Sequence, residues 1–219
     1  MPTVSHAIVR PTVHVVDDDD SFRTAIARLL SAAGYAVRTY SSAAEFIQSH
    51  VEAGPGCVLL DMFMPDATGL DVQAALAKRN DRLPLIFISG QGTISDTVRA
   101  MQAGAVDFLT KPVQRNALLK AVEIAIASDR EARSRRDKEH ETALYYRALT
   151  PRQRAVFDAV VTGKLNKQIA AELGVAERTV KAHRAKVMKK MHAESVAELV
   201  RLSVHLQHGG GVPQDRGRV

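Results

Sequence analysis

The chain has 219 residues, of which 46% are hydrophobic and 25% are charged, values typical of one large or two small globular domains. Its single cysteine, Cys57, excludes an internal disulfide and is expected to fill space in a buried strand of a protein from a reducing compartment. No run of residues approaches 18 apolar positions, and residues 1–10 lack the apolar core of a signal peptide. These features predict a cytoplasmic protein with no membrane partner.

Formal charge is divided unevenly along the chain. Residues 1–127 carry 11 Lys and Arg against 13 Asp and Glu, a net charge of −2, whereas residues 128–219 carry 19 against 11, a net charge of +8. A near-neutral first part and a basic second part predict two domains, the second with an anionic partner.

Short apolar runs alternate with helical patterns between residues 12 and 127. Strands are predicted at 13–16, 36–40, 57–61, 85–88 and 106–109. A helix follows each strand: the first ends near 34, the next three span 41–48, 70–78 and 94–103, and the last begins near 114. Five strands alternating with five helices predict an α/β domain with a parallel sheet covered on both faces. A flexible arm is expected at 1–11.

The remainder of the chain is predicted to be helical. Residues 128–148 are rich in Asp, Arg, Glu and Lys and form a charged helical linker, because so few apolar residues cannot support a coiled coil. Helices are then predicted from Thr150, which precedes Pro151 as a cap, and at about 166–173, 177–191 and 195–206. This pattern predicts a small all-α domain over 149–206 and a disordered tail over 207–219.

Polar side chains stand where four of the predicted strands end. Asp17 and Asp18 follow the first strand, Asp61 ends the third, Ser89 follows the fourth and Lys111 follows the fifth. We expect them to converge, because the carboxyl ends of parallel strands meet at one edge of a sheet. Carboxylates there would suit Mg²⁺, and a lysine with a hydroxyl would complete a phosphoryl site in which Asp61 is the nucleophile.

In order and spacing this set resembles the receiver domain of two-component response regulators, over residues 12–127. The resemblance implies a flavodoxin-like (βα)5 fold and Mg²⁺ held by Asp17, Asp18, Asp61 and the backbone carbonyl of Phe63, with Asp17 acting largely through water. It further implies that Asp61 is the phosphoacceptor of a sensor histidine kinase, and that the phosphoryl-contacting and switch residues are Lys111, Ser89 and the aromatic Phe108.

Each of these residues has a simpler interpretation when taken alone. Asp19 and Asp20 suit the first turn of a helix, and Phe108 suits a core. Two positions depart from the family pattern: Ser89 stands where threonine is commoner, and residues 65–69 lack the usual glycine after proline, which leaves the loop conformation open.

Between positions 178 and 190, the predicted helix at 177–191 contains six Lys and Arg and no acid. Val180, Val187 and Met191 fall on one side of it, so the opposite face is basic and exposed. A preceding helix and a glycine turn favour a helix-turn-helix for the DNA major groove. Lys181 is expected to contact a base, and small alanines allow close approach, in a DNA-binding set of Lys167, Arg178, Thr179, Lys181, Ala182, Arg184, Ala185, Lys186 and Lys189.

Residues 149–206 resemble the LuxR-type helix-turn-helix of the NarL/FixJ regulators, with the FixJ branch nearest. The resemblance is carried by Leu149-Thr150-Pro151-Arg152, by Asn166-Lys167-Gln168-Ile169-Ala170, by Thr179-Val180-Lys181-Ala182-His183 and by Lys189-Lys190-Met191. Ala176 stands where the family often has a capping serine, so this helix is expected to fray until DNA orders it.

The two resemblances together predict a phosphorylation-activated bacterial transcription regulator. Its expected partners are a sensor histidine kinase, double-stranded promoter DNA, a second copy of the chain after phosphorylation, and RNA polymerase as a further candidate. The last helix, with Val196, Leu199, Val200 and Ser203, is a candidate dimer contact.

Two alternatives differ in class. A metal phosphatase would place a second acid two residues after its nucleophile, but Phe63 occupies that position and cannot transfer protons; the chain is therefore not expected to be an enzyme. An architectural DNA binder with an inactive receiver is disfavoured by the complete set of receiver residues.

Overall fold

The computed structural model describes residues 10–49, 54–79, 83–91 and 93–208, so most of the expected arm and tail lie outside the described residues. The chain divides into two compact units, Met1–Arg133 and Ser134–Val219, which are described here one at a time. Among the described helices, none combines the length and the apolar character needed to cross a bilayer.

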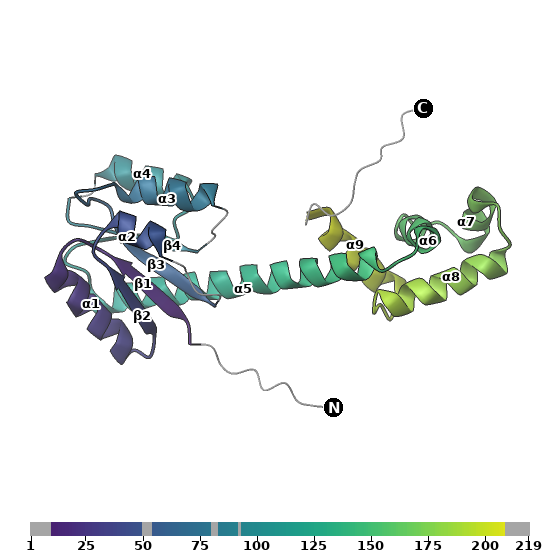
Figure 1. Ribbon diagram of the computed structural model, residues 1–219, viewed down its shortest axis with the longest axis horizontal. Coiled ribbons are helices and arrows are strands. Elements are labelled where there is room, and N and C mark those ends of the chain that lie inside the picture. The colour runs from purple at the N-terminus through teal and green to yellow at the C-terminus, as the bar shows by residue number, and fades with distance from the viewer. Residues whose placement is uncertain (1–9, 50–53, 80–82, 92, 209–219) are drawn as a thin grey trace. The chain divides into compact units, whose positions relative to one another are not determined.

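The first unit contains one parallel sheet with strand order β2-β1-β3-β4-β5 (Figure 1). This order is that of the flavodoxin-like doubly wound fold, which confirms the predicted class. Each observed strand begins and ends within one residue of its predicted bounds: β1 Thr12–Val16, β2 Ala36–Tyr40, β3 Gly56–Asp61, β4 Leu85–Ser89 and β5 Asp107–Thr110. The helices are α1 Asp20–Ala32, α2 Ala43–Gln48, α3 Gly69–Lys78, α4 Ile94–Gln102 and α5 Arg115–Arg147.

Two apolar layers cover the two faces of the sheet, because alternate residues of a strand point to opposite sides. One layer joins Leu60 and Phe87 of the strands to Phe46, Val72 and further residues of α2, α3 and α4. The other joins alternate strand residues, including Cys57 and Leu59, to α1 and α5. Cys57 is fully buried, and burial raises the pKa of its thiol to about 12, so it is a packing residue as expected.

Side-chain caps fix where the helices of this unit begin. Asp19 accepts hydrogen bonds from the backbone N–H groups of Ser21 and Phe22 at the start of α1, as expected for an acid at a helix N-terminus. Thr68 and Thr93 form capping boxes at the starts of α3 and α4.

Helix α5 continues without interruption through the expected charged linker. The ends of that segment are packed: Asp129 is 1% exposed within the first unit and Tyr146 is 9% exposed within the second. The Asp129 carboxylate accepts the Gly56 N–H at 2.9 Å and the Arg133 Nε–H at 2.7 Å. A buried carboxylate with these partners anchors α5 to the first unit beyond its apolar core.

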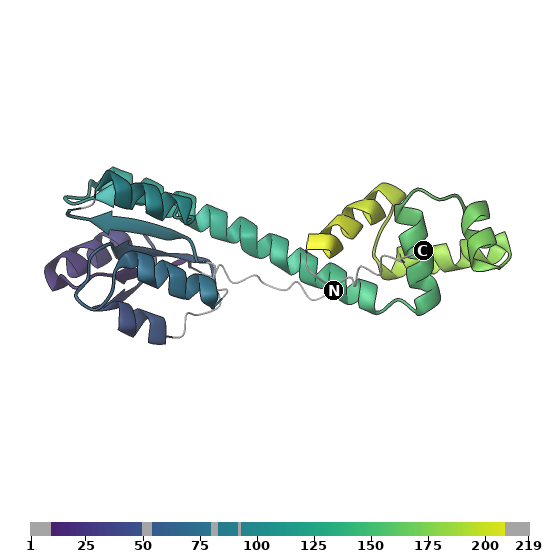
Figure 2. The same cartoon turned by 90° about the horizontal axis from the view of Figure 1, so that it is seen from above.

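In the second unit the end of α5 is followed by four helices, α6 Pro151–Val161, α7 Asn166–Leu173, α8 Glu177–Lys190 and α9 Val196–His208 (Figure 2). They enclose an apolar core to which Val156, Val180, Val187 and Met191 contribute buried side chains. The predicted helices are confirmed, and α9 runs two residues past its predicted end. Gly174 provides the left-handed turn between α7 and α8, with φ of 63°.

Candidate functional site

The carboxyl ends of β1 and β3 bring three acidic side chains together. One carboxylate oxygen from each of Asp17, Asp18 and Asp61 lies within 4.8 Å of the others. Asp17 is 1% exposed and Asp61 is 7% exposed, whereas Asp18 faces solvent. Hard oxygen donors with one solvent-facing member match what Mg²⁺ requires, because this ion keeps part of its water shell. The residues therefore fit a magnesium ion.

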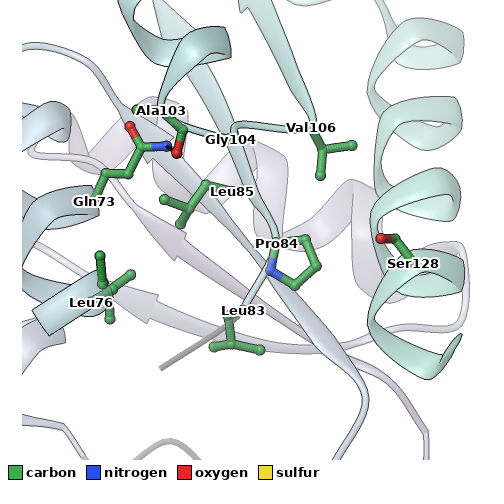
Figure 3. A pocket seen from close by; sticks show the side chains of 10 residues that line it. Gln73, Leu76, Leu83, Pro84, Leu85, Ala103, Gly104, Val106 and Ser128 are labelled. Atoms are coloured by element: carbon green, nitrogen blue, oxygen red, sulfur yellow. Dashed lines mark hydrogen bonds between the residues drawn. The ribbon is translucent and has the colours of Figure 1, made fainter. Parts of the chain in front are cut away.

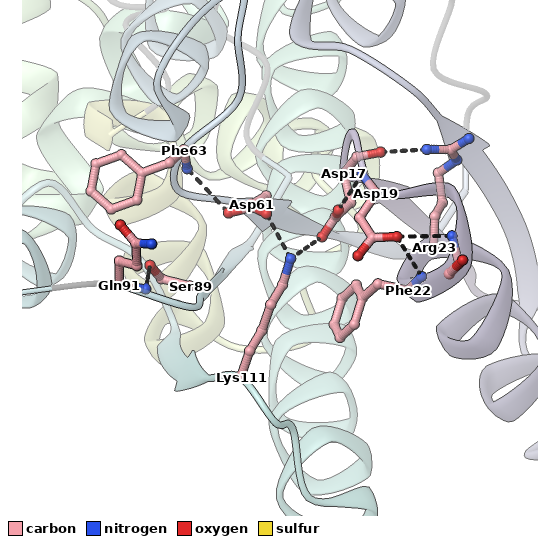
Figure 4. A network of polar contacts seen from close by, with 10 residues as sticks. Asp17, Asp19, Phe22, Arg23, Asp61, Phe63, Ser89, Gln91 and Lys111 are labelled. Carbon is pink, nitrogen blue, oxygen red and sulfur yellow. Dashed lines mark hydrogen bonds and ion pairs between the residues drawn. The ribbon is translucent and has the colours of Figure 1, made fainter.

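Lys111, which follows β5, lies over this cluster (Figure 4). Its Nζ is 2.7 Å from Oδ2 of Asp61 and 2.8 Å from Oδ2 of Asp17. One ammonium thus links the ends of β1, β3 and β5, as the sequence predicted. Such proximity among buried carboxylates needs a cation, since unpaired buried charges are costly.

The cluster alters two pKa values in a consistent way. Burial raises the pKa of Asp17, and the negative charge of Asp61 adds to this, although the Lys111 hydrogen bond opposes it. Burial lowers the pKa of Lys111, but its hydrogen bonds to Asp17 and Asp61 outweigh that effect and leave the pKa above its ordinary value. This shift favours the charged form of Lys111 beside the two carboxylates.

The remaining residues predicted for this site lie close by. Ser89 ends β4 and is 1% exposed, and its Oγ accepts the Gln91 N–H at 3.2 Å. The Phe63 N–H donates to Oδ1 of Asp61 at 3.1 Å, and Figure 4 shows Phe63, Ser89 and Gln91 together on one side of Asp61. Phe108 is partly buried against the layer formed with α2, α3 and α4.

Two neighbours of the cluster were not anticipated. The Phe22 ring centroid lies 4.2 Å from Nζ of Lys111, and Nη1 of Arg23 donates to the Asp17 carbonyl at 2.6 Å. Both residues come from α1, and no local pattern distinguishes them from other positions on an amphipathic helix. Their role depends on how α1 packs against the sheet.

A hollow of about 410 Å³ lies at the start of β4, away from the carboxyl ends of the strands (Figure 3). Its lining contains no charged residue and includes Leu76, Leu85, Val106 and Ser128. The Gln73 amide donates to the Ala103 carbonyl at 3.0 Å. Without charged groups the lining of this hollow does not suit a phosphoryl group, in contrast to the acidic cluster.

The residues predicted to contact DNA lie on or beside α8. Six of those on α8 are exposed, namely Arg178, Lys181, Ala182, Ala185, Lys186 and Lys189, while Thr179 and Arg184 are half-buried; Lys167 is exposed on α7. The Nη1 of Arg184 donates to the Asn166 side chain at 3.0 Å and so links α8 to α7. Lys190 instead donates to the Ala148 carbonyl and to Gln153.

Comparison with known proteins places both units in families. Residues 13–123 match the response regulator receiver domain, and residues 147–203 match the luxR family of bacterial regulatory proteins. The chain is 44% identical to nodulation protein W of Bradyrhizobium diazoefficiens, covering 91% of this chain and 88% of that protein. It is 38% identical to the transcriptional regulatory protein FixJ of Azorhizobium caulinodans, covering 88% and 91%.

Solved structures agree with this assignment. The response regulator StyR is 42% identical and superposes with a TM-score of 0.80, over 89% of this chain and 98% of that chain. Full-length FixJ from B. japonicum is 32% identical with a TM-score of 0.56, over 93% and 98%. The chain therefore belongs to the NarL/FixJ family of response regulators, the two-component transcription regulators that join a receiver domain to a luxR-type helix-turn-helix.

Proposed function

We propose that Asp61 accepts a phosphoryl group from a sensor histidine kinase and that this modification controls binding of promoter DNA by α8. The observation that carries the proposal is the position of Lys111, 2.7 Å from Asp61 at the edge of a three-carboxylate cluster. In the transfer, an Asp61 oxygen forms a bond to phosphorus while the bond from phosphorus to the kinase imidazole nitrogen breaks, so the acyl phosphate needs no further co-reactant.

The residues around Asp61 have different roles in phosphoryl transfer. Asp17, Asp18, Asp61 and the Phe63 carbonyl would hold Mg²⁺, which supplies positive charge to the transferring oxygens. Lys111 would supply a second positive charge to the same oxygens. Because phosphoryl transfer depends mainly on positioning and charge neutralisation, the two positive charges would account for the reactivity of Asp61.

Ser89 and Phe108 are proposed to convert the modification into a change of shape. A phosphoryl oxygen on Asp61 would offer an acceptor to the buried Ser89 hydroxyl. In the unphosphorylated protein the Ser89 Oγ accepts the Gln91 N–H. Movement of β4 toward Asp61 would leave space for Phe108 and repack the surface of α4 and β5. Ile94 is 86% exposed on α4, an apolar group suited to homodimer formation after this change.

The basic face of α8 is proposed to enter the DNA major groove. Lys181 and the small residues Ala182 and Ala185 are exposed on α8, where base edges would lie. Phosphate contacts are proposed for Lys167, Thr179, Arg184 and Lys189. A homodimer would read paired half-sites. Promoter binding by a cytoplasmic regulator brings RNA polymerase into reach as a further partner.

The chain is proposed to act as a switch and not as an enzyme with turnover. Phe63, at the position where a phosphatase would carry an acid, has no proton to give or take. Slow loss of the phosphoryl group to water is the expected limit of its catalysis.

The test is Mg²⁺-dependent labelling of the full chain by acetyl phosphate, followed by measurement of affinity for promoter DNA. We expect labelling of Asp61 and tighter DNA binding by the labelled protein. Asp61→Asn should lose both, whereas Asp66→Asn, which neutralises an exposed acid of the same loop, should keep both. If Asp61→Asn still gained DNA affinity on treatment with the phosphodonor, the proposal would be wrong.

A further inference from the structure

Phe22 lies in the first turns of α1, beside the cluster but outside the set of residues that the family pattern identifies. Its backbone N–H donates to the Asp19 cap at 3.1 Å, and its partly buried side chain packs against the apolar layer formed with α1 and α5. The hydrogen bond fixes the backbone at Phe22, and the packing restricts the ring. Its centroid lies 4.2 Å from Nζ of Lys111 (Figure 4).

This distance is well within the range at which an ammonium is attracted to the negative face of an aromatic ring, roughly 6 Å. The Lys111 side chain is only 21% exposed, and partial removal from water strengthens the attraction. A lysine carries its charge on a flexible four-carbon stem. A fixed ring next to the charge restricts the orientations that this stem can adopt.

We propose that Phe22 is a positioning residue for phosphoryl transfer, because its ring holds the Lys111 ammonium over Asp61. The proposal rests on the functions proposed above for Asp61 and Lys111. In the resting protein the ammonium contacts two carboxylates and the ring. When the phosphoryl group arrives, Lys111 must exchange a carboxylate oxygen for a phosphoryl oxygen. Its contact with the Phe22 ring can persist during this exchange.

The effect on Mg²⁺ affinity distinguishes this positioning role from a purely structural packing role. Lys111 and Mg²⁺ compete for the carboxylates of Asp17 and Asp61, so a ring that strengthens the hold of Lys111 on them opposes the metal. Loss of the ring should therefore slow phosphoryl transfer while leaving Mg²⁺ affinity unchanged or slightly tighter. Collapse of the pocket would weaken both.

The experiment compares Phe22→Leu, Phe22→Met and Phe22→Tyr in the full chain. Labelling rates are measured with acetyl phosphate at saturating Mg²⁺, and Mg²⁺ affinity is measured by titration calorimetry without phosphodonor. We expect about fivefold slower labelling for the Leu and Met variants, a typical size for loss of a partly desolvated cation–ring contact, with Mg²⁺ affinity equal to or tighter than wild type. Phe22→Tyr keeps a ring face and should label at the wild-type rate.

Tyr35→Leu is the matched control, because it removes a ring that packs against the same apolar layer without a cation–ring contact to Lys111. It should label at the wild-type rate. Wild-type labelling by both Phe22→Leu and Phe22→Met, equal slowing by Phe22→Tyr, or a parallel fall in Mg²⁺ affinity would overturn the inference. Absence of labelling in the wild-type protein would instead overturn the proposed function and this inference with it.

Discussion

The carboxylate of Asp129 in α5 and the backbone N–H of Gly56 at the start of β3 form a buried hydrogen bond of 2.9 Å across 73 positions of sequence. The same carboxylate pairs with Arg133 one helical turn later. This contact extends the packed part of α5 beyond Ile126, the last residue of the apolar layer on that face. It also joins α5 to the strand whose other end carries Asp61.

Asp129→Ala should therefore destabilise the first unit. Its removal leaves a buried N–H without an acceptor and Arg133 without its acid, which together cost about 2–4 kcal/mol. Differential scanning calorimetry of the full chain should show a lower first-unit transition. Asp137→Ala removes an exposed acid of the same helix and should have almost no effect, so equal shifts in the two variants would contradict the anchor.

Lys111→Met should destabilise the first unit mainly when Mg²⁺ is absent. The substitution leaves Asp17 and Asp61, whose side chains are 2% and 8% exposed, without their shared cation, at a cost of about 3 kcal/mol. A divalent ion neutralises the same carboxylates and should restore most of that loss. Urea unfolding with Mg²⁺ and with EDTA measures the difference, and an equal loss in both buffers would count against a shared site.

Mg²⁺ itself should raise the thermal midpoint of the first unit, because an ion that binds only the folded state stabilises it. At a concentration 100-fold above its dissociation constant the gain is about 2.7 kcal/mol. Asp18→Asn should abolish the gain without disturbing the ion pairs of Lys111, which involve Asp17 and Asp61. A midpoint that rises equally in Asp18→Asn would show that the ion binds elsewhere.

Ala176→Ser should stabilise the second unit. Ala176 is the N-cap of α8, with φ of −69° and ψ of 146°, and provides no side-chain hydrogen bond. A serine hydroxyl there can accept a free N–H of the first turn, worth about 1 kcal/mol, which should appear as a higher midpoint by circular dichroism. Ala171→Ser, at an exposed position inside α7, offers no such acceptor role and should give no gain.

Two lysines of α8 should separate DNA affinity from folding. Lys181 is exposed, and its ion pair with Glu177 is long, at 3.8 Å. Lys181→Ala should therefore weaken DNA binding about tenfold with little change in midpoint. Lys190 donates to the Ala148 carbonyl and to Gln153, so Lys190→Ala should lower stability by about 1 kcal/mol. Reversed effects in DNA titrations and melting curves would reassign the two residues.

The sequence by itself determined the elements and their order. Short apolar runs located the strands within one residue, and caps such as Thr150 located helix starts, because these signals act over a few neighbouring positions. The spacing of Val180, Val187 and Met191 likewise identified the buried side of α8, since all three are at most 1% exposed. The order of polar residues at strand ends was enough to anticipate that Asp17, Asp61 and Lys111 meet.

Only the tertiary structure decided which side chains complete these sites. The Phe22 ring lies beside Lys111, and the Asp129 carboxylate accepts the Gly56 N–H. Arg184, which was predicted to contact DNA, donates to the Asn166 side chain. Each pair joins two separate segments of the chain, so the repeat of a single helix or strand does not bring its members together. Their contacts depend on how whole helices pack against the sheet or against one another, a property of the assembled core that no short stretch of sequence contains.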